Sequence, residues 1–402
     1  MRLAILSFHT SPLAQPGAGD GGGMNVYVRE LCSALAHAGL DCDVYTRAWR
    51  RGLEPVVSVE PGFRVHHVAA GPGAALPRSA LLGLVGPFTE GVRQRLLDHG
   101  VPDLIHANYW LSGAAGHALK HELELPLVST FHTLARVKAD PDDDHGERAR
   151  VEAEVIGCSD SIIASCDEER AQLERLYGAV PARVETVAPG VDHDVFSPGD
   201  RRAARSALGL GGTPVLLFVG RIQPLKGAAT AIEAVAELPG HRPTLVLVGG
   251  PSGPNGAAEL RRLRHLADSL GVRHQIRFVA PQPHRRLATY YRAADVCLVP
   301  SHSESFGLVA LEAAACGTPV IAAAVGGLPT IVDHGRTGFV VEGGDPRTFA
   351  THVAELLDRP SRAAPMAEAA AAKARRYSWS ITAARLRRLY ADLTERRLVA
   401  CR

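Results

Sequence analysis

The sequence predicts an α/β protein with two doubly wound domains, each built around a parallel β-sheet. Short aliphatic runs alternate with longer amphipathic stretches along all 402 residues, which is typical of repeated strand–helix units. The alternation begins afresh at Val215, directly after a stretch from Ser197 to Pro214 that is rich in Pro, Gly and charge. Each half also opens with a strand that leads into a glycine-containing segment. Ligands of such folds bind at the carboxyl ends of the strands, so a site is expected there.

In the first half, short aliphatic and β-branched runs predict the strands. These are Leu3–Phe8, Asp43–Tyr45, Val65–Val68, Leu104–His106, Leu127–Thr130, Ser161–Ala164 and Val184–Val187. Between them, apolar residues that recur every three or four positions predict helices. Three such helices are Val26–Ala38, Phe88–His99 and Asp167–Tyr177.

The second half repeats the pattern. Its predicted strands are Val215–Val219, Thr244–Val248, Ile276–Val279, Val296–Val299, Val320–Ala322 and Gly338–Val340. Its predicted helices include Ala228–Leu238, Ala257–Leu270, Pro283–Ala294 and Leu308–Cys316. A last helix, about Trp379 to Arg397, has no strand partner. We therefore expect a first domain over residues 1–196, a linker over 197–214, a second domain over 215–378, and a C-terminal helix over 379–402 that packs back on the first domain.

Composition excludes several classes of protein. Hydrophobic residues make up 46 % and charged residues 21 % of the chain, values typical of a globular protein. The net charge of +2 creates no overall field that would attract nucleic acid or an anionic membrane. No apolar run approaches the roughly 20 residues needed to span a bilayer. The opening MRLAILSFHTSP lacks a small-residue cleavage site and is expected to form a strand, so a cytoplasmic location is expected.

Seven cysteines are scattered along the chain. They are Cys32, Cys42, Cys158, Cys166, Cys297, Cys316 and Cys401. The count is odd, no C-x-x-C occurs, and most of their neighbours are aliphatic. This pattern favours reduced, buried thiols over a disulfide framework or a zinc site, and no metal is expected.

The glycine-rich segment QPGAGDGGGMNVYVRELC lies near the start of the chain. Gly17, Gly19 and Gly22 spell G-x-G-x-x-G, but a dinucleotide fold places the first glycine directly after the first strand. Here that strand ends near Phe8, nine residues earlier, and no Gly-Lys-Ser/Thr of a P-loop is present. No nicotinamide, flavin or other cofactor is therefore expected. Gly21–Gly23 still place backbone N–H groups at a helix N-terminus, which favours an anion, although a plain strand-to-helix turn is the alternative.

The stretch PSHSESFGLVALEAAACGTPVIA predicts a nucleotide-sugar site. Glu304 follows a strand and Glu312 lies two helical turns further, about 12 Å along the axis. The amides of Phe306, Gly307 and Leu308 fall between the two carboxylates. One carboxylate would suit sugar hydroxyls, the amides a diphosphate, and the other carboxylate a ribose diol. The alternative is a helix cap and a solvated charge. However, Glu312 stands in an apolar helix, so a buried carboxylate there needs a partner.

The stretch FVGRIQPLKG places two cations at the end of a strand. Arg221 and Lys226 would neutralise a leaving diphosphate, as a bivalent metal does elsewhere. The motif alone is not specific for a diphosphate site, and together with Glu304 and Glu312 it indicates one.

Two further candidates are less specific. Asp140-Pro141-Asp142 has the D-x-D form that holds a metal on a diphosphate, but it stands in a polar acidic loop and is expected to be a solvated turn. His132 follows the strand Leu127–Thr130, so both a site role and a structural role remain open.

Taken together, these stretches resemble glycosyltransferase family 4, whose members have the GT-B architecture of two Rossmann-like domains that face a central cleft. The resemblance spans nearly the whole chain. Its pieces are the early Gly-Gly loop, PGVDHDVF at 189–196, GRIQPLKG at 220–227, GGPSGPNG at 249–256, Glu304-x7-Glu312, GTPVIA and GGLP.

Within the family, HTSPLAQPGAGDGGGMNVYV, NYWLSG, HTLARVK and GGPSGPN most resemble the branch that acts in mycothiol biosynthesis. That branch moves N-acetylglucosamine from UDP to 1L-myo-inositol 1-phosphate with retention and without a metal ion. The resemblance implies an acceptor-binding first domain, a nucleotide-sugar-binding second domain, and possible homodimers.

The resemblance also implies roles for single residues. Gly23, Arg221 and Lys226 would bind the donor diphosphate, Glu304 the transferred sugar and Glu312 the ribose. His132 would contact the sugar near the reacting centre. Asn25 would contact the cyclitol. The acceptor phosphate would be held at the positions Arg78, Tyr109, Thr133 and Arg148.

The departures from this branch lie on the acceptor side. Arg78 replaces a lysine, and Asn108 stands where the family usually has histidine. Four acidic residues, Asp140 and Asp142–Asp144, follow HTLARVK. An antibiotic-pathway relative that joins a GDP-activated octose to the thiol ergothioneine is therefore an alternative. A nucleotide-sugar 2-epimerase and a non-catalytic nucleotide-sugar-binding protein are two more.

Overall fold

The chain folds into two compact units. The computed structural model describes residues 1–17, 19, 21–77, 80–137, 145–238, 240, 242–253 and 255–401, and the backbone only of residue 145. The first unit comprises Met1–Ala14, Met24–Ala188 and Trp379–Arg402. The second comprises Gln15–Gly23 and Pro189–Ser378. The glycine-rich segment thus belongs to the second unit, although both of its neighbours in sequence belong to the first.

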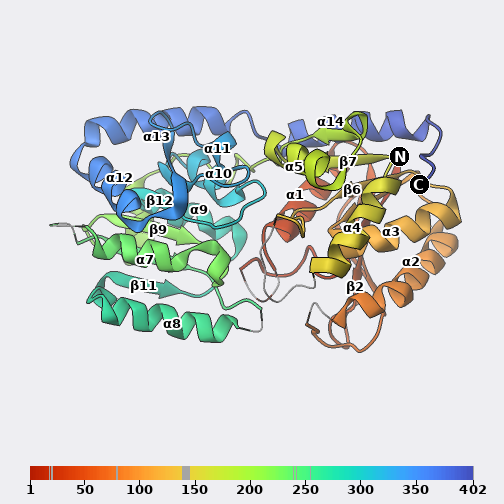
Figure 1. Cartoon of the computed structure of the whole chain (residues 1–402), viewed down its shortest axis with the longest axis horizontal. Helices are drawn as coiled ribbons and strands as arrows, with labels where there is room; N and C mark the ends of the chain where they lie inside the picture. Colours follow the sequence, from red (N-terminus) through yellow and green to blue (C-terminus); the bar gives the residue numbers. More distant parts are fainter. Residues whose placement is uncertain are drawn as a thin grey trace. The chain divides into compact units, whose positions relative to one another are not determined.

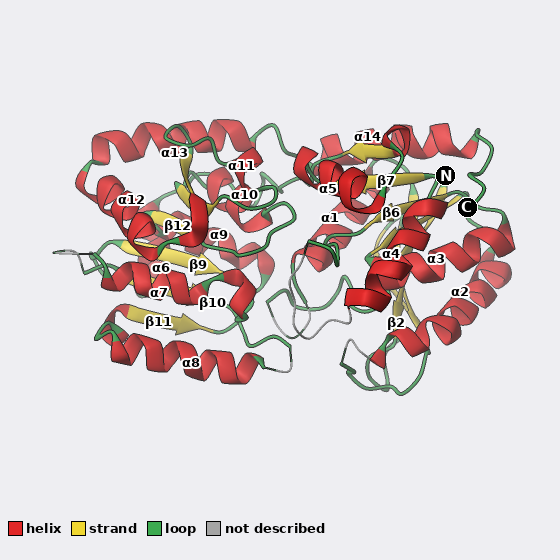
Figure 2. Ribbon diagram, viewed as in Figure 1, coloured by secondary structure: helices red, strands yellow, loops and turns green. Residues whose placement is uncertain are grey.

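An eight-stranded sheet forms the middle of the first unit, with helices packed against it (Figures 1 and 2). The strands are β1 (Arg2–Leu6), β2 (Asp41–Arg47), β3 (Val56–Glu60), β4 (Phe63–Val68), β5 (Leu104–Asn108), β6 (Leu127–Thr130), β7 (Ser161–Ala164) and β8 (Val184–Thr186). The helices are α1 (Gly23–His37), α2 (Val85–His99), α3 (Trp110–Leu123), α4 (His145–Cys158), α5 (Asp167–Tyr177) and α14 (Trp379–Thr394), with short 3-10 turns at Leu82–Leu84 and Pro181–Arg183.

The strand order is β3-β4-β2-β1-β5-β6-β7-β8, and β3 is antiparallel to β4 whereas the other pairs are parallel. Alternate residues of β1 enter two different cores. Leu3 and Ile5 pack with residues of α1 and α14, whereas Ala4 and Leu6 pack with residues of α2 and α3. Helices therefore cover both faces of the sheet, which is the doubly wound arrangement.

The second unit repeats the architecture around a fully parallel six-stranded sheet of order β11-β10-β9-β12-β13-β14. Its strands are β9 (Val215–Val219), β10 (Thr244–Val248), β11 (Ile276–Val279), β12 (Val296–Val299), β13 (Val320–Ala323) and β14 (Gly338–Val341). Its helices are α6 (Arg201–Ala207), α7 (Ala228–Ala236), α8 (Gly256–Ser269), α9 (Leu287–Ala293), α10 (Leu308–Ala315), α11 (Leu328–Ile331), α12 (Pro346–Asp358) and α13 (Pro360–Ala374). Four 3-10 turns complete it: η4 (Pro224–Lys226), η5 (Arg273–Gln275), η6 (His284–Arg286) and η7 (Glu342–Gly344).

The predicted fold class is confirmed, but the edge strand β3 was not predicted and the chain divides at a different point. The longer segment of the second unit begins at Pro189, and the stretch predicted as a linker contains helix α6. Asp200 caps this helix, because its Oδ1 accepts hydrogen bonds from the amides of Arg202 and Ala203 at 2.8 and 3.1 Å. Helix α14 belongs to the first unit, where Tyr390 and His106 are hydrogen-bonded (2.8 Å).

The prediction of buried, free thiols is confirmed for five cysteines, and the other two contact each other. Cys32, Cys42, Cys166, Cys297 and Cys316 are free and buried. Cys158 and Cys401, 243 residues apart in sequence, lie in a disulfide contact with their Cα atoms 4.5 Å apart. No sequence pattern indicates this contact, because the two cysteines are so distant along the chain. Among the described residues, no helix has the length and apolar character that crossing a membrane requires.

Candidate functional site

The glycine-rich segment packs beside Arg221 within the second unit. It closes on itself through a hydrogen bond from the Gly17 amide to the Gly21 carbonyl (2.9 Å). The Gly17 carbonyl accepts from the Gly250 amide (3.0 Å). A Cβ atom added at Gly22 would lie only 3.2 Å from Arg221 Nε. The absence of a side chain therefore lets the backbone approach the guanidinium group closely, as a shared anion would require.

Lys226 and Glu304 face each other across the second unit's strand ends. Lys226 Nζ lies 2.7 Å from Glu304 Oε2, and the two side chains are 24 % and 19 % exposed. Lys226 ends the turn η4, and Gly227 follows with φ 71°. A Cβ at Gly227 would lie 1.9 Å from the carbonyl oxygen of Pro300, in the segment that leads to Glu304. Glycine is thus required for the two segments to come together.

The N-terminus of α10 lies directly beyond Glu304. Its N-cap is Gly307, with φ 105° and no side-chain cap, so no side chain of the cap residue occupies the first amides. A Cβ at Gly307 would lie 2.5 Å from Leu328 Cδ2, whereas one at Gly23 would lie 3.7 Å from Leu308 Cδ1. The glycine-rich segment, the α10 amides and the Lys226 segment are therefore assembled in one unit, and helix N-termini of this kind favour phosphate groups.

Glu312 has the partners that its burial demands. Its side chain is 6 % exposed, with Oε1 2.7 Å from His284 Nε2, and Oε2 accepts a hydrogen bond from the Tyr291 hydroxyl (2.8 Å). Burial, together with the charge of Glu312, raises the pKa of Tyr291 well above its usual value, so the phenol stays a donor. His284 and Tyr291 were not predicted as site residues. Their only sequence signal is that a carboxylate within an apolar helix requires a donor.

In the first unit, two strained residues follow adjacent strands. Among the described residues other than glycine, positive φ angles occur at Tyr109 (79°), Glu124 (54°) and His132 (61°). Tyr109 directly follows β5, and His132 comes two residues after β6, the neighbouring strand. Strained backbone of this kind clusters at functional sites because the surrounding structure must hold it. Two residues predicted for the site thus have a strained backbone that the surrounding structure holds in place.

His132 is a neutral imidazole. Desolvation, with a smaller contribution from His106, lowers its pKa to about 3. Its Nε2 lies 2.9 Å from Asn108 Oδ1, a geometry in which the imidazole donates to the amide oxygen. Asn108, which departs from the family pattern, therefore orients His132.

Three of the four residues predicted to hold the acceptor phosphate come together. Arg148 Nη2 donates to the carbonyl oxygen and to Oγ1 of Thr133 at 2.8 and 3.0 Å, and the Arg148 guanidinium lies 5.2 Å from the centre of the Tyr109 ring. Arg148 Nε also donates to Glu152 Oε1 (2.7 Å), and both side chains are buried. Glu152, which was not predicted, is held in turn by the Tyr177 hydroxyl. The fourth residue, Arg78, lies outside the described residues, as do Asp140 and Asp142.

Asn25 is buried at the start of α1. Its Nδ2 donates to Thr10 Oγ1 (2.7 Å) and to the carbonyl oxygen of Ser11 (2.6 Å). The side chain thus fixes the loop that follows β1, and its predicted contact with a cyclitol stays a prediction.

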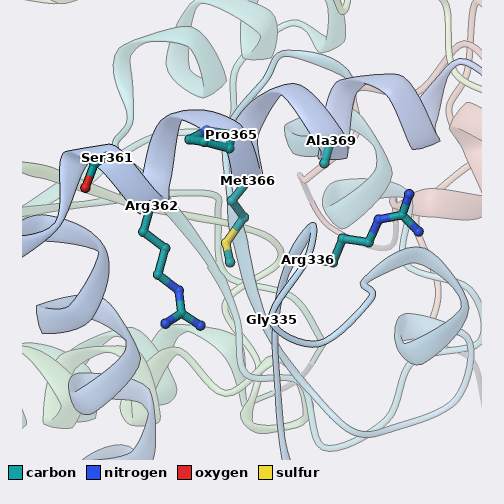
Figure 3. A pocket seen from close by; sticks show the side chains of 7 residues that line it. All are labelled: Gly335, Arg336, Ser361, Arg362, Pro365, Met366 and Ala369. Carbon is teal, nitrogen blue, oxygen red and sulfur yellow. The ribbon is translucent and has the colours of Figure 1, made fainter.

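A separate hollow of the second unit lies against α13 (Figure 3). It is lined by Gly335, Arg336, Ser361, Arg362, Pro365, Met366 and Ala369, and the side chains of Arg336 and Arg362 extend from opposite sides of it. None of the predicted site residues lines it, so it is distinct from the residues predicted to bind the donor.

Comparisons with known proteins identify the family and the fold. The model of "Glycosyltransferase Family 4" matches residues 21–195, and that of "Glycosyl transferases group 1" matches residues 200–374. The chain is 50 % identical to D-inositol 3-phosphate glycosyltransferase 2 of Catenulispora acidiphila, over 98 % of this chain and 95 % of that protein. It is 47 % identical to D-inositol 3-phosphate glycosyltransferase of Mycobacterium tuberculosis, over 95 % of this chain and 81 % of that protein.

Among solved structures, sucrose-phosphate synthase from Thermosynechococcus elongatus is similar with a TM-score of 0.92 and 34 % identity, covering 98 % of each chain. The sequence relatives share close to half of their residues with this chain over nearly its full length, and this structural relative shares its architecture. The chain therefore belongs to glycosyltransferase family 4, has the GT-B fold, and is a glycosyltransferase that uses a nucleotide-sugar donor.

Proposed function

We propose that this enzyme transfers N-acetylglucosamine from UDP to 1L-myo-inositol 1-phosphate, with retention of the anomeric configuration and without a metal ion or other cofactor. The observation that carries the proposal is the convergence of Tyr109, Thr133 and Arg148, which come from the ends of two strands and from helix α4. A guanidinium, a hydroxyl and a phenol held together in this way suit a phosphate monoester.

On the acceptor side, the buried position of Arg148 makes the recognition specific. Its guanidinium is anchored through Nε to Glu152 and through Nη2 to Thr133. Bonds at these two nitrogens fix the plane of the group, so an anion can approach it only in a defined orientation. The names of the relatives, which refer to inositol 3-phosphate, support the same class of acceptor.

On the donor side, the second unit offers charge and backbone amides for a diphosphate. Arg221 and Lys226 supply two cations, and the Lys226–Glu304 pair (2.7 Å) would open to hold the phosphate and a sugar hydroxyl. The amides at Phe306, Gly307 and Leu308 would bind the diphosphate. Glu312, whose carboxylate already accepts from Tyr291, retains lone pairs for a ribose hydroxyl.

The proposed mechanism proceeds on one face of the sugar. The bond from the anomeric carbon to the UDP oxygen breaks as the bond to the acceptor oxygen forms on the same side. The departing phosphate oxygen takes the acceptor proton, so neither a protein nucleophile nor a metal is required. His132 is neutral at physiological pH, so it contributes by hydrogen bonding rather than as a charged acid. Catalysis rests on positioning and on charge stabilisation of the leaving group.

One observation favours a second class of acceptor. Glu152 lies 2.7 Å from Arg148 and neutralises part of its charge, which weakens its attraction for a phosphate. A small thiol that carries a carboxylate, combined with a GDP-activated sugar, would need less positive charge at this position.

A donor-by-acceptor screen read by mass spectrometry tests the proposal. It crosses UDP- and GDP-activated sugars with inositol phosphate, free cyclitols and small thiols such as ergothioneine. The expected product is N-acetylglucosaminyl-inositol phosphate, with NMR showing the retained configuration. Product with a thiol alone would establish the second acceptor class and refute the first. Conversion of UDP-N-acetylglucosamine without any acceptor would indicate an epimerase instead, and inertness with every pair would indicate a non-catalytic binding protein.

A further inference from the structure

Two histidines and two cysteines of the first unit converge, and none of the four belongs to the proposed donor or acceptor residues. His117 and His121 lie four residues apart on α3, Cys158 ends α4, and Cys401 lies in the C-terminal tail. One ligand atom from each of the four residues lies within 4.8 Å of the others. Among the described residues, these four form the one group of histidines, cysteines and carboxylates that could hold a metal ion.

Four of the distances within this group are close to those around a shared metal ion, whereas the two sulfurs stand in disulfide contact and would have to separate to bind one. The two Nε2 atoms are 3.1 Å apart, and Cys401 Sγ lies 2.9 Å from His121 Nε2 and 3.8 Å from His117 Nε2. Cys158 Sγ lies 3.7 Å from His121 Nε2. In a tetrahedral zinc site with bonds of about 2.0–2.3 Å, neighbouring ligand atoms lie about 3.3–3.8 Å apart.

We propose that His117, His121, Cys158 and Cys401 form a structural zinc site. The alternative is a disulfide bond between Cys158 and Cys401, whose sulfurs are in contact. Two observations favour the metal. A disulfide needs no imidazoles, yet both Nε2 atoms point at the sulfurs and at each other. The chain also keeps five further cysteines free, which indicates a reducing environment in which disulfides are rare.

The chemistry of the site balances without a redox step. Both cysteines are synthesised as thiols, and each releases one proton when it binds Zn²⁺ as a thiolate. Two neutral imidazoles and two thiolates complete a closed tetrahedral set, which leaves no position for a substrate, so the metal is structural rather than catalytic.

The site would fasten the C-terminal tail to the first unit. The tail is already held near α3 and α4, because the Val399 amide donates to Asp160 Oδ1 (2.6 Å), and Asp160 Oδ2 accepts from the buried Lys120 of α3 (2.7 Å). A metal bound by Cys401 would close the last residues onto these same helices. This inference does not depend on the identity of the donor or the acceptor.

The full chain, purified under reducing conditions with added ZnSO₄ and then dialysed, provides the test. Elemental analysis should show about one zinc per chain. Titration of thiols in denaturant with a chelator and no reductant should show all 7 cysteines, whereas a Cys158–Cys401 disulfide would leave 5. Replacing zinc with Co²⁺ should give the thiolate charge-transfer and visible bands of a tetrahedral site.

Cys401→Ser removes one of the four proposed ligands. Cys401 lies in the C-terminal tail and belongs to none of the hydrophobic cores, so this substitution should not disturb the packing. The zinc content of the variant should fall at least fivefold, whereas the exposed control His99→Ala should keep one zinc. Chelation should lower the melting temperature of the wild type but not that of Cys401→Ser. Five thiols without metal would show a disulfide and overturn the proposal. Seven thiols without metal, or full zinc content in Cys401→Ser, would overturn it equally.

Discussion

The proposed donor side in the second unit and the proposed acceptor side in the first unit are constructed in different ways. The donor side depends on glycine backbone: a Cβ at Gly227 would lie 1.9 Å from the Pro300 carbonyl oxygen, and one at Gly326 would lie 1.6 Å from that of Glu304. The acceptor side depends on buried side chains, with Arg148 fixed by Glu152 and Thr133. In the same unit the backbone is strained at Tyr109 and at His132, which is predicted to contact the transferred sugar, and neither residue is a glycine.

This difference explains what each side can recognise. Backbone amides and close-packed glycines make a rigid cradle for a diphosphate, a group common to all nucleotide-sugar donors. Side chains held by specific partners distinguish one small acceptor from another, because each hydrogen bond has a fixed direction. The four predictions below test that division.

The largest effect is expected from Lys226→Ala. Loss of the cation that faces the leaving diphosphate should lower kcat about 10³-fold, because one charged donor at a developing charge contributes on that order. The measurement is steady-state turnover with the native donor and acceptor.

Lys373→Ala is the matched control for this change. Lys373 Nζ also lies 2.7 Å from a carboxylate of the second unit, Oδ1 of Asp333, but neither residue belongs to the proposed site. Its turnover should stay within twofold of the wild type. Near wild-type turnover in Lys226→Ala, or an equal loss in both variants, would contradict the donor-site assignment.

The second prediction concerns backbone packing on the donor side. Gly227→Ala should lower the free energy of unfolding by more than about 3 kcal/mol, because the new Cβ collides with a carbonyl group and φ is positive. Gly335→Ala, at φ 75° with nothing within 4 Å of the added Cβ, should cost only about 1–2 kcal/mol. Denaturant unfolding measures both, and equal losses would show that close packing at Gly227 is unimportant.

The same contrast explains how much the sequence could predict. Strands β6, β7, β9, β10, β11 and β12 have the bounds that their aliphatic runs predicted. The donor residues lie in short glycine-containing motifs, so their spacing was readable. By contrast, the partners of the site residues predicted in the first unit are single side chains without a motif: Glu152 for Arg148 and Asn108 for His132. Only packing brings such pairs together, which local sequence patterns do not report.

Helix α6 and strand β3 were missed for related reasons. The predicted linker is polar and glycine-rich, but a single cap at Asp200 suffices to start a helix in it. Strand β3 is an edge strand that is partly exposed, so it lacks the apolar run of a central strand.

The third prediction is that the stability of the first unit depends on pH through two buried histidines. Burial lowers the pKa of His106 to about 3, from a usual 6.5, and His132 is shifted to a similar value. Both imidazoles are neutral in the folded protein, whereas they bind a proton below about pH 6.5 in the unfolded chain. The free energy of unfolding is therefore highest above pH 6.5 and decreases as the pH falls from there towards 3. The shift of His106 alone should lower the free energy of unfolding by about 2 kcal/mol between pH 7 and pH 5.

Hydrogen exchange at pH 5 and pH 8, corrected for intrinsic rates, provides the measurement. Peptides that contain β5 and β6 should lose protection at the lower pH before β9 and β12 of the second unit. Equal protection of β5 and β6 at both values would show that these histidines are not held neutral.

The smallest effect is expected from Thr133→Val, which removes the hydroxyl that accepts from Arg148 (3.0 Å) and keeps the shape of the side chain. The KM for inositol phosphate should rise about tenfold, and the donor KM should not change, because one hydrogen bond to a charged group contributes about 1.5 kcal/mol. The control is Thr89→Val, which removes a hydroxyl bonded within α2. A rise in the donor KM instead would show that Thr133 binds the donor and not the acceptor.

The central claim is that Tyr109, Thr133 and Arg148 recognise the phosphate of the acceptor, and one comparison tests it most directly. The value of kcat/KM is measured for 1L-myo-inositol 1-phosphate and for free inositol, with UDP-N-acetylglucosamine as donor. The account predicts a preference of at least 100-fold for the phosphorylated acceptor, which Arg148→Ala reduces to less than tenfold if the variant folds and which Thr133→Val lowers in any case. Equal kcat/KM values for the two acceptors in the wild-type enzyme would contradict it.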